Sequence, residues 1–496
     1  MSRRTPKPRY LRPRQKTAAP TLGPIVAEMD SDLSQYYFGR DRYVSRALRP
    51  DDPATVFIGP KGVGKSAILQ MVRLDRENAA DLGRVITVSP DDLTFPTVAA
   101  LETEAPWIRA EKRQQWLFTE LWSFVLLYQV LRREFHNRQG VSGFFKSLFR
   151  AKKEDRQVQK LIELGEQAGS QKLGSAVLGM ISHIRVGGVE LGIREASATA
   201  TNNEYSVLSL VNSVANEIKR RELSHTYYIL IDDLDLHWTN DLLQNEFLGG
   251  LLLAIRKLSR SDHIKLLASL RDYIFSQIPL EDKDKYRDAV VTVLWDRDDI
   301  EQMVAKRLSF HFTCDAKDVW TKVFPESAAD KLWRHTTGMP RECIRLAYLA
   351  IENATRSGHS RIDENSLRDA IGQFASEKIE DLESTYRHHY PDLGRITGRF
   401  RGGPREFSIE RIREIAFGIA DSYESDRHAY SKLEWATGFF DEPALLAQIL
   451  AEVGFLQVKE NRKAPARTLP ENEVDSITDA CWFAVHPMYA PALALR

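Results

Sequence analysis

The stretch Val56-Phe-Ile-Gly-Pro-Lys-Gly-Val-Gly-Lys-Ser66 decides the fold, because it fits the pattern G-x-x-x-x-G-K-[ST] and begins with an apolar, strand-like run. In such a loop the glycines leave backbone N–H groups free to point at phosphate oxygens, and a helix opens directly after them. The amphipathic stretch Ala67-Ile-Leu-Gln-Met-Val-Arg-Leu74 supplies that helix. Strand, loop and helix therefore follow one another in the order that a nucleotide phosphate site requires.

The residue types of this loop predict individual contacts with a nucleoside triphosphate. Lys65 is expected to bridge the β- and γ-phosphates as a point charge, and the Ser66 hydroxyl is expected to ligate Mg²⁺. A chance turn rich in glycine and lysine is the alternative, and the helix that follows argues against it. The residues predicted to bind the nucleotide here are Gly59, Pro60, Lys61, Gly62, Val63, Gly64, Lys65, Ser66 and Ala67.

A second motif, Tyr227-Tyr-Ile-Leu-Ile-Asp-Asp-Leu-Asp235, places acids directly after five apolar residues. It indicates a buried parallel strand whose carboxylates lie at the C-terminal edge of the sheet, where nucleotides bind in open α/β folds. We expect Asp232 to hold Mg²⁺ and Asp233 to polarise an attacking water, with Asp235 orienting a partner group or capping the next turn. Such acids can also be plain helix caps, but the upstream loop favours the metal role. The two motifs together predict binding of ATP or GTP.

Composition narrows the class of protein. The chain has 496 residues, and its Lys+Arg and Asp+Glu totals are both 69, so no global field points to nucleic acid or membrane. Three widely spaced cysteines offer neither metal-ligand spacing nor a disulfide framework, which fits a cytoplasmic location. The basic, proline-rich segment 1–30 lacks the apolar core of a secretory signal and is predicted to be a flexible tail. The apolar runs 116–131 and 247–255 are too short to span a membrane and are predicted to be buried helices.

The order of elements predicts an α/β fold: a P-loop NTPase core with a parallel sheet, a large and mostly helical insertion, a helical lid and a C-terminal winged-helix domain. The sheet strands are expected at Val56, at 84–88, at the acid-bearing motif, at 264–270 and at 290–295. The expected domains are a tail at 1–30, the two core parts at 31–106 and 224–300, the insertion at 107–223, the lid at 301–375 and the winged-helix-like part at 376–496.

The insertion carries two signals of its own. Residues 181–193 alternate around Gly187-Gly188 as a hairpin does. Residues 131–160 hold nine Lys/Arg against three Asp/Glu and are interleaved with phenylalanines. The second stretch fits either a nucleic-acid contact or a solvated amphipathic helix with its loop.

The part of the chain after the core is predicted to contain helices first, and then both helices and strands. The expected helices are 298–307, 328–356 with a break at Gly338-Met-Pro340, 408–419, 431–439 and 443–453, and the expected strands are 455–459 and 480–486. Three helices followed by a two-stranded wing suggest a winged helix-turn-helix.

These motifs resemble the STAND-type and origin-initiator-like branch of the AAA+ P-loop ATPases, which includes proteins of bacterial anti-phage defence. The resemblance covers about 36–490. Phe38-Gly-Arg-Asp41 looks like the family's F-x-G-R-[ED] box, which implies that Gly39 and Arg40 lie against the adenine. The acids after the third strand are similar to the family's hhhhD[DE]-x-D strand end.

Two further boxes carry the resemblance. Ser269-Leu-Arg271 sits where a sensor monitors the γ-phosphate, and Gly338-Met-Pro-Arg341 resembles a lid box that returns a residue to the nucleotide. The resemblance thus implies catalytic or binding roles for Arg271 and Arg341. The alternatives are that Arg271 pairs with a nearby aspartate, Asp272 or Asp296, and that Arg341 is an ordinary residue at a helix start.

The departures from the family pattern favour a switch over a motor. The family usually places Glu where Asp233 stands, and no clear finger arginine precedes the fourth strand. We therefore expect a slowly hydrolysing ATPase that uses ATP and Mg²⁺. The resemblance implies a role in a bacterial defence complex, and because no nuclease, protease, deaminase or TIR-like constellation is visible, the toxic activity would then belong to a separate effector. The expected role of this chain is the sensor or regulatory ATPase of that complex, as a homo-oligomer or hetero-complex.

Two alternatives stay open: a DNA-binding initiator that uses its winged helix, and a scaffold whose assembly ATP stabilises. Segment 401–496 has 11 Lys/Arg against 15 Asp/Glu, and 443–453 has no basic residue. This charge disfavours nucleic acid as the partner.

Overall fold

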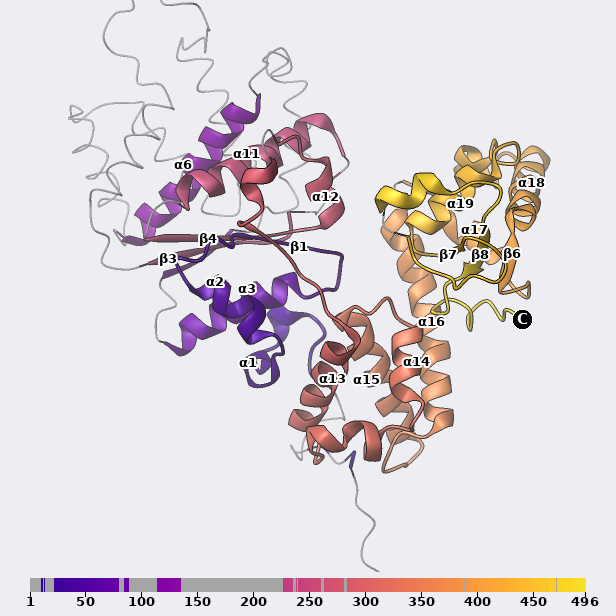
Figure 1. The fold of residues 1–496 in the computed structure, drawn as a ribbon, viewed down its shortest axis with the longest axis horizontal. Coiled ribbons are helices and arrows are strands. Elements are labelled where there is room, and N and C mark those ends of the chain that lie inside the picture. The colour runs from indigo at the N-terminus through magenta and orange to yellow at the C-terminus, as the bar shows by residue number, and fades with distance from the viewer. Residues whose placement is uncertain are drawn as a thin grey trace, which may run out of the picture. The chain divides into compact units, whose positions relative to one another are not determined.

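A computed structural model describes residues 10–11, 13, 22–79, 84–88, 114–134, 226–234, 238, 240–259, 263–280, 283–387, 389–469 and 471–496. The chain forms two compact units, Gly39–Leu294 and a second unit made of Met1–Phe38 with Trp295–Arg496, and each is described by itself (Figure 1). Most of the predicted insertion, including the hairpin at 181–193 and residues 135–160 of the basic stretch, lies outside the described residues.

The unit Gly39–Leu294 is built on a five-stranded parallel sheet, which confirms the predicted α/β core. Its strand order is β2-β3-β4-β1-β5. The strands are β1 (Val56–Ile58), β2 (Val85–Val88), β3 (Tyr227–Ile231), β4 (Ile264–Leu270) and β5 (Val290–Thr292). Every residue of β3 and β4 is buried, because helices cover both faces of the sheet and leave no face for water.

Helices lie on both faces of this sheet. In Figure 1, α2 (Ser45–Leu48) and α3 (Lys65–Asn78) lie on one face, and α6 (Gln114–Glu134), α11 (Leu242–Leu258) and α12 (Asp272–Gln277) lie on the other. β5 ends at Thr292, three residues before the predicted end, because Leu294 bonds to the Tyr43 hydroxyl instead of continuing the ladder.

The apolar runs predicted to be buried helices are parts of α6 and α11, which pack tightly against each other. A β-carbon at Gly250 would lie 2.5 Å from Cβ of Phe118, so only glycine permits this backbone approach. A buried carboxylate, Glu120, accepts from Lys257 Nζ at 2.8 Å across the two helices. Within the described residues, no helix is both long and apolar enough to cross a bilayer.

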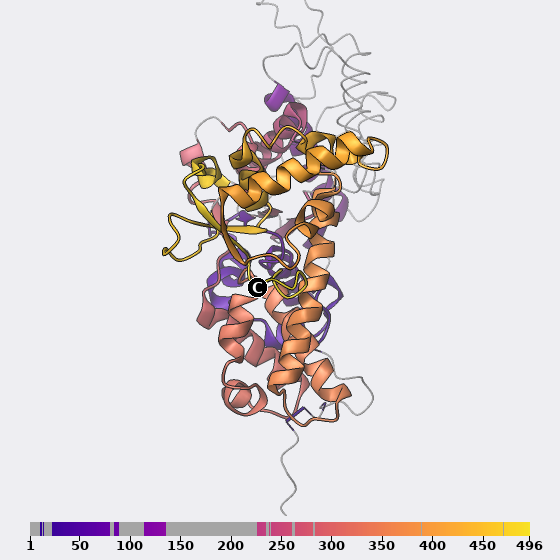
Figure 2. The same cartoon turned by 90° about the vertical axis from the view of Figure 1, so that its right-hand side faces the viewer.

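In the second unit, four helices cover the region predicted to be the lid. They are α13 (Arg297–His311), α14 (Ala328–Arg334), α15 (Pro340–Arg356) and α16 (Glu364–Tyr386), with short 3-10 and π-helical turns at Ala316–Asp318 and Val319–Val323. The predicted break at Gly338-Met-Pro340 separates α14 from α15. Helix α16, the long orange helix in Figure 2, runs straight through the boundary predicted between residues 375 and 376.

The prediction of a flexible tail through residue 30 is wrong for residues 22–30. This segment packs on α13, where the buried Arg307 donates to Leu22 O at 2.5 Å and to Asp30 Oδ2 at 2.8 Å. Tyr36 of α1 (Leu33–Tyr36) also donates its hydroxyl to Asp30. A guanidinium has five donors, and this segment supplies several of their acceptors, which the basic composition of the tail does not reveal.

The C-terminal part contains helices and a small antiparallel sheet. Its elements are α17 (Leu393–Gly398), β6 (Glu406–Ser408), α18 (Ile409–Ser425), a 3-10 helix (Ser431–Ala436), α19 (Pro443–Glu452), β7 (Leu456–Lys459), a 3-10 helix (Glu471–Ser476) and β8 (Trp482–Val485). The sheet has three strands in the order β6-β8-β7, one more than the predicted two-stranded wing. The segment predicted to be helical over 431–439 is a shorter 3-10 helix. The winged-helix description stays a prediction.

Candidate nucleotide-binding site

The loop between β1 and α3 has the backbone of a phosphate cradle. Gly59, Gly62 and Gly64 have φ values of 151°, 88° and 104°, a region that strongly favours glycine. A β-carbon at Gly59 would lie 3.1 Å from Cγ1 of Val63 and 3.3 Å from the carbonyl oxygen of Val293. The three glycines are therefore required by the course of the loop, which brings bare backbone to the start of α3.

Lys65 is the first residue of α3 and turns its side chain back into the loop. Its Nζ donates to Gly59 O at 2.7 Å and to Pro60 O at 2.9 Å. Ser66 and Ala67 follow in the first helical turn, where backbone N–H groups have no partner within the helix. An ammonium, a hydroxyl and helix N–H groups gathered in one loop are donors that fit a polyphosphate and its metal ion.

The acids lie at the same edge of the sheet as this loop. Ile231 pairs with Ala268 and Ile58 pairs with Leu270, so Asp232 and Gly59 both follow directly after paired residues. β4 lies between their two strands, which separates the two strand ends by about 10 Å, or two strand spacings. This is the edge at which the sequence predicts phosphate and metal to bind.

The two carboxylates differ in their surroundings. Asp232 is half-buried, and its Oδ1 accepts from the Ser269 hydroxyl and from the Asp233 N–H, the latter at 3.0 Å. Asp233 is exposed and has a left-handed backbone with φ of 57°. One acid is thus held by two donors while its neighbour faces outward. The third acid, Asp235, lies outside the described residues.

Arg271 extends the end of β4, next to the strand that carries the loop. Its Nη1 donates to the Tyr273 hydroxyl at 3.2 Å, and its guanidinium carbon lies 5.8 Å from the centre of the same ring. The two aspartates considered as its partners serve as acceptors for backbone: Asp272 accepts from Tyr273 N–H and Asp296 from Asp299 N–H.

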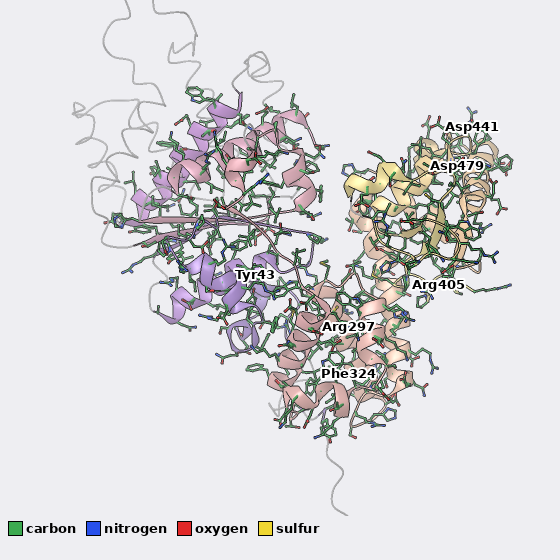
Figure 3. All side chains as sticks on the ribbon, in the orientation of Figure 1. Tyr43, Arg297, Phe324, Arg405, Asp441 and Asp479 are labelled. Carbon is green, nitrogen blue, oxygen red and sulfur yellow. The ribbon has the colours of Figure 1, made fainter. Side chains whose placement is uncertain are left out.

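The box resembling an adenine contact forms a π-helical turn, Arg40–Val44, that starts after Gly39 at φ of 85°. Arg40 pairs with Asp75 of α3. Tyr43, labelled in Figure 3, donates its hydroxyl to Leu294 O at 2.7 Å and accepts from Leu294 N–H at 3.0 Å. The turn is therefore fastened both to the helix of the phosphate loop and to the chain after β5.

Arg341 belongs to the other unit and is exposed in the first turn of α15. The turn before it is rigid, because Gly338 has φ of 75° and a β-carbon there would lie 3.0 Å from the Trp333 ring. Glu342 also accepts from the N–H and the hydroxyl of Thr337, each at 2.7 Å. The side chain of Arg341 thus projects from a well-held helix start.

Sequence reasoning named Ser269 only as the start of the sensor box and did not single out Tyr43 or Tyr273; the structure shows all three in contact with site residues. Ser269 had a signal, because it is the one hydroxyl in an otherwise mostly apolar strand. The clamp of Tyr43 on Leu294 joins residues 251 positions apart, and no local pattern announces it.

The family model described as the FunZ-associated C-terminal helical domain matches residues 298–383, which span α13 to most of α16. Among curated proteins, none matches significantly.

Several solved structures match over most of the chain. They include the Aeropyrum pernix ORC1 protein in complex with DNA (13% identity, 91% of this chain and 94% of that chain, TM-score 0.40). Cdc6p from Pyrobaculum aerophilum matches with 11% identity, 91% and 92% coverage and a TM-score of 0.31. The Aeropyrum pernix ORC2 protein with ADPNP and ADP matches with 13% identity, 90% and 88% coverage and a TM-score of 0.34. Because these sequence identities and TM-scores are low, the assignment of the site rests on the chain's own residues.

Proposed function

We propose that the protein is a P-loop ATPase that binds ATP with Mg²⁺ at this sheet edge, hydrolyses it slowly and acts as a switch. The observation that carries the proposal is the phosphate loop itself. Three glycines adopt left-handed backbone, the Lys65 side chain turns back from α3 into the loop, and Asp232 lies on the same edge two strands away.

The proposed roles follow from the chemistry of each side chain. Backbone N–H groups of residues 61–67 would hold the phosphates, and Lys65 would exchange the two loop carbonyls for phosphate oxygens. Ser66 and Asp232 would hold Mg²⁺, and Asp233 would orient water. When bound, Mg²⁺-ATP supplies the phosphoanhydride bond that water cleaves. Arg271 and Arg341 are proposed to contact the γ-phosphate, and Gly39 and Arg40 to lie near the adenine.

Slow turnover is proposed because of Asp233. Its side chain is one methylene shorter than the Glu usual in the family pattern that the motifs resemble, and it stands on a left-handed backbone with φ of 57°. A slow enzyme keeps its triphosphate long enough to hold one arrangement. Moving a two-state equilibrium from 1:99 to 99:1 needs about 5.5 kcal/mol of differential nucleotide affinity, which several charged γ-phosphate contacts can supply.

We place this switch in the cytoplasm as the sensor or regulatory ATPase of a bacterial defence complex, working with a separate effector protein. The motif resemblance supports this role, and the match of 298–383 to a FunZ-associated domain is a second pointer.

The surface of α19 supports a protein partner over DNA. The helix carries no Lys or Arg, exposes Leu445, and is preceded by the exposed acids Asp441 and Glu442. Figure 3 shows Asp441 at the outside of the C-terminal part. DNA contacts require cations on the element that docks. Tight binding of duplex DNA by the full chain, falling steeply between two salt concentrations, would overturn this preference.

Asp233→Asn tests the proposed function. We expect ATP affinity within about threefold of wild type and turnover lower by about a hundredfold, since the amide cannot polarise water as a carboxylate does. Asp284→Asn is the matched control, because Asp284 is an exposed acid in the same unit. Steady-state hydrolysis and equilibrium binding of ATP give the two quantities. Equal turnover by wild type and Asp233→Asn would refute the assignment.

A further inference from the structure

A series of two aromatic contacts begins at Arg271. Tyr273 receives the hydrogen bond from Arg271 and lies under its guanidinium. The Tyr273 ring in turn packs edge-on against Trp238, with ring centres 5.5 Å apart and planes at 65°. Any displacement of Arg271 therefore changes the contacts of Tyr273, and through that ring the contacts of Trp238.

Trp238 is tied to the start of α11. Its Nε1 donates to Asn245 Oδ1 at 3.0 Å, and Asn245 Nδ2 donates to Asn240 Oδ1 at 2.9 Å. Asn245 is buried, and Asn240 has a left-handed backbone with φ of 58°. Asp241 then caps α11 by accepting from the N–H of Leu243 at 2.8 Å. The indole, the turn and the helix start are thus one hydrogen-bonded assembly.

Helix α11 packs against α6 with the two backbones in close contact. A β-carbon at Gly250 would lie 2.8 Å from the carbonyl carbon of Phe118, and Trp122 Nε1 donates to Phe247 O at 3.1 Å. Close-packed interfaces of this kind transmit shifts instead of absorbing them. A displacement at the start of α11 would therefore reach α6, the described helix of the predicted insertion.

We propose that Tyr273 is a positioning residue for Arg271, and that Trp238 couples the state of Arg271 to α11 and α6. The inference rests on the proposed function. A triphosphate is a far stronger acceptor for a guanidinium than a neutral phenol. Arg271 has further N–H donors for the triphosphate and keeps its bond to the Tyr273 hydroxyl when ATP binds, so the ring of Tyr273 shifts with it against Trp238. The nucleotide state is thereby transmitted to the face of the sheet that α6 and α11 cover (Figure 1).

A double-mutant cycle tests the positioning role through turnover and ATP affinity. Tyr273→Phe keeps the ring and removes the hydroxyl, so we expect kcat to fall by about tenfold with the Kd for ATP within about twofold. For Arg271→Ala we expect kcat to fall further than for Tyr273→Phe. If Tyr273 acts through Arg271, the double variant is no slower than Arg271→Ala alone. Additive losses, or normal turnover of either single variant in an otherwise active enzyme, would overturn the inference.

Tryptophan emission tests the coupling independently of turnover. ATP is expected to change the emission of wild type, and the change is expected to vanish in Trp238→Phe and in Arg271→Ala. Trp435→Phe is the matched control, because Trp435 also packs on a tyrosine, Tyr390, at 5.1 Å and donates to a backbone carbonyl, but lies in the other unit. A full ATP response in Trp238→Phe would refute the coupling. Wild type that does not bind ATP at all would instead refute the proposed function, and this inference with it.

Discussion

Replacing Lys65 by Met removes the ammonium and keeps the length of the side chain, so it isolates the charge that the phosphate loop holds. Without nucleotide the change costs little. The Nζ of Lys65 makes two hydrogen bonds to loop carbonyls, at 2.7 and 2.9 Å, and water can replace a donor at this partly exposed position. We expect a loss of about 1 kcal/mol in the free energy of unfolding.

With nucleotide the difference is larger. At an ATP concentration 100 times its Kd, binding stabilises wild type by about 2.7 kcal/mol. For a unit as long as Gly39–Leu294 this raises the melting temperature by about 5–10 °C. Loss of the charge-assisted phosphate contacts that raises Kd a hundredfold leaves about 0.4 kcal/mol of stabilisation at the same ATP concentration. The expected shift for Lys65→Met is therefore about 1 °C.

The assay is thermal unfolding with and without Mg²⁺-ATP on wild type, Lys65→Met and Arg73→Met. Arg73 is an exposed cation on the same helix, and its loss controls for a change in charge and in helix propensity. Wild type and Arg73→Met are expected to show the same ATP-dependent shift. If Lys65→Met showed it too, the ammonium would play no part in binding, and the reasoning from the loop geometry would be refuted.

Two further predictions concern a hydroxyl and a histidine. Ser269→Ala removes a donor from Asp232, so turnover is expected to need about tenfold more Mg²⁺, whereas Ser276→Ala at an exposed site should leave the Mg²⁺ titration unchanged. Burial lowers the pKa of His486 to about 4, so protonation favours the unfolded chain. The stability from the neutral imidazole is full above the unfolded pKa and declines as pH falls from about 6.5 toward 4, by about 2 kcal/mol at pH 5. In His486→Asn, whose side-chain oxygen can accept from Met488 N–H as Nδ1 does, the melting temperature should fall less between pH 7 and 5; equal pH profiles would contradict the assignment.

The elements predicted correctly from sequence are those with strong local signals. The runs of β3 and β4 predict buried strands because they are apolar apart from Lys265 and Ser269 in β4, and the glycines of the phosphate loop predict the turn into α3. The break between α14 and α15 follows from Gly338 and Pro340, which end one helix and start another.

The features that sequence reasoning missed depend on distant partners. Asp30 looks like one acid among many, and its burial with Arg307, 277 positions away, helps to keep residues 22–30 in place. The hydroxyl of Tyr43 replaces a strand partner for Leu294, which is why β5 stops early. Strand β6 has three residues and pairs with β8, so neither its length nor its pattern predicts it. In each case the deciding interaction is long-range, and periodicity reports only local order.

The position of β4 separates binding from turnover. This strand lies between the strand of the phosphate loop and the strand of the acids. Ser269 and Arg271 are two positions apart in extended backbone, so their side chains lie on the same face at the end of β4. Ser269 contacts Asp232, while Arg271 follows the residue paired with Ile58. Changes on the β1 side should therefore abolish ATP binding, whereas changes on the β3 and β4 sides should spare binding and slow hydrolysis. A nucleotide held but not cleaved is what a switch requires, so β4 is where its lifetime would be set.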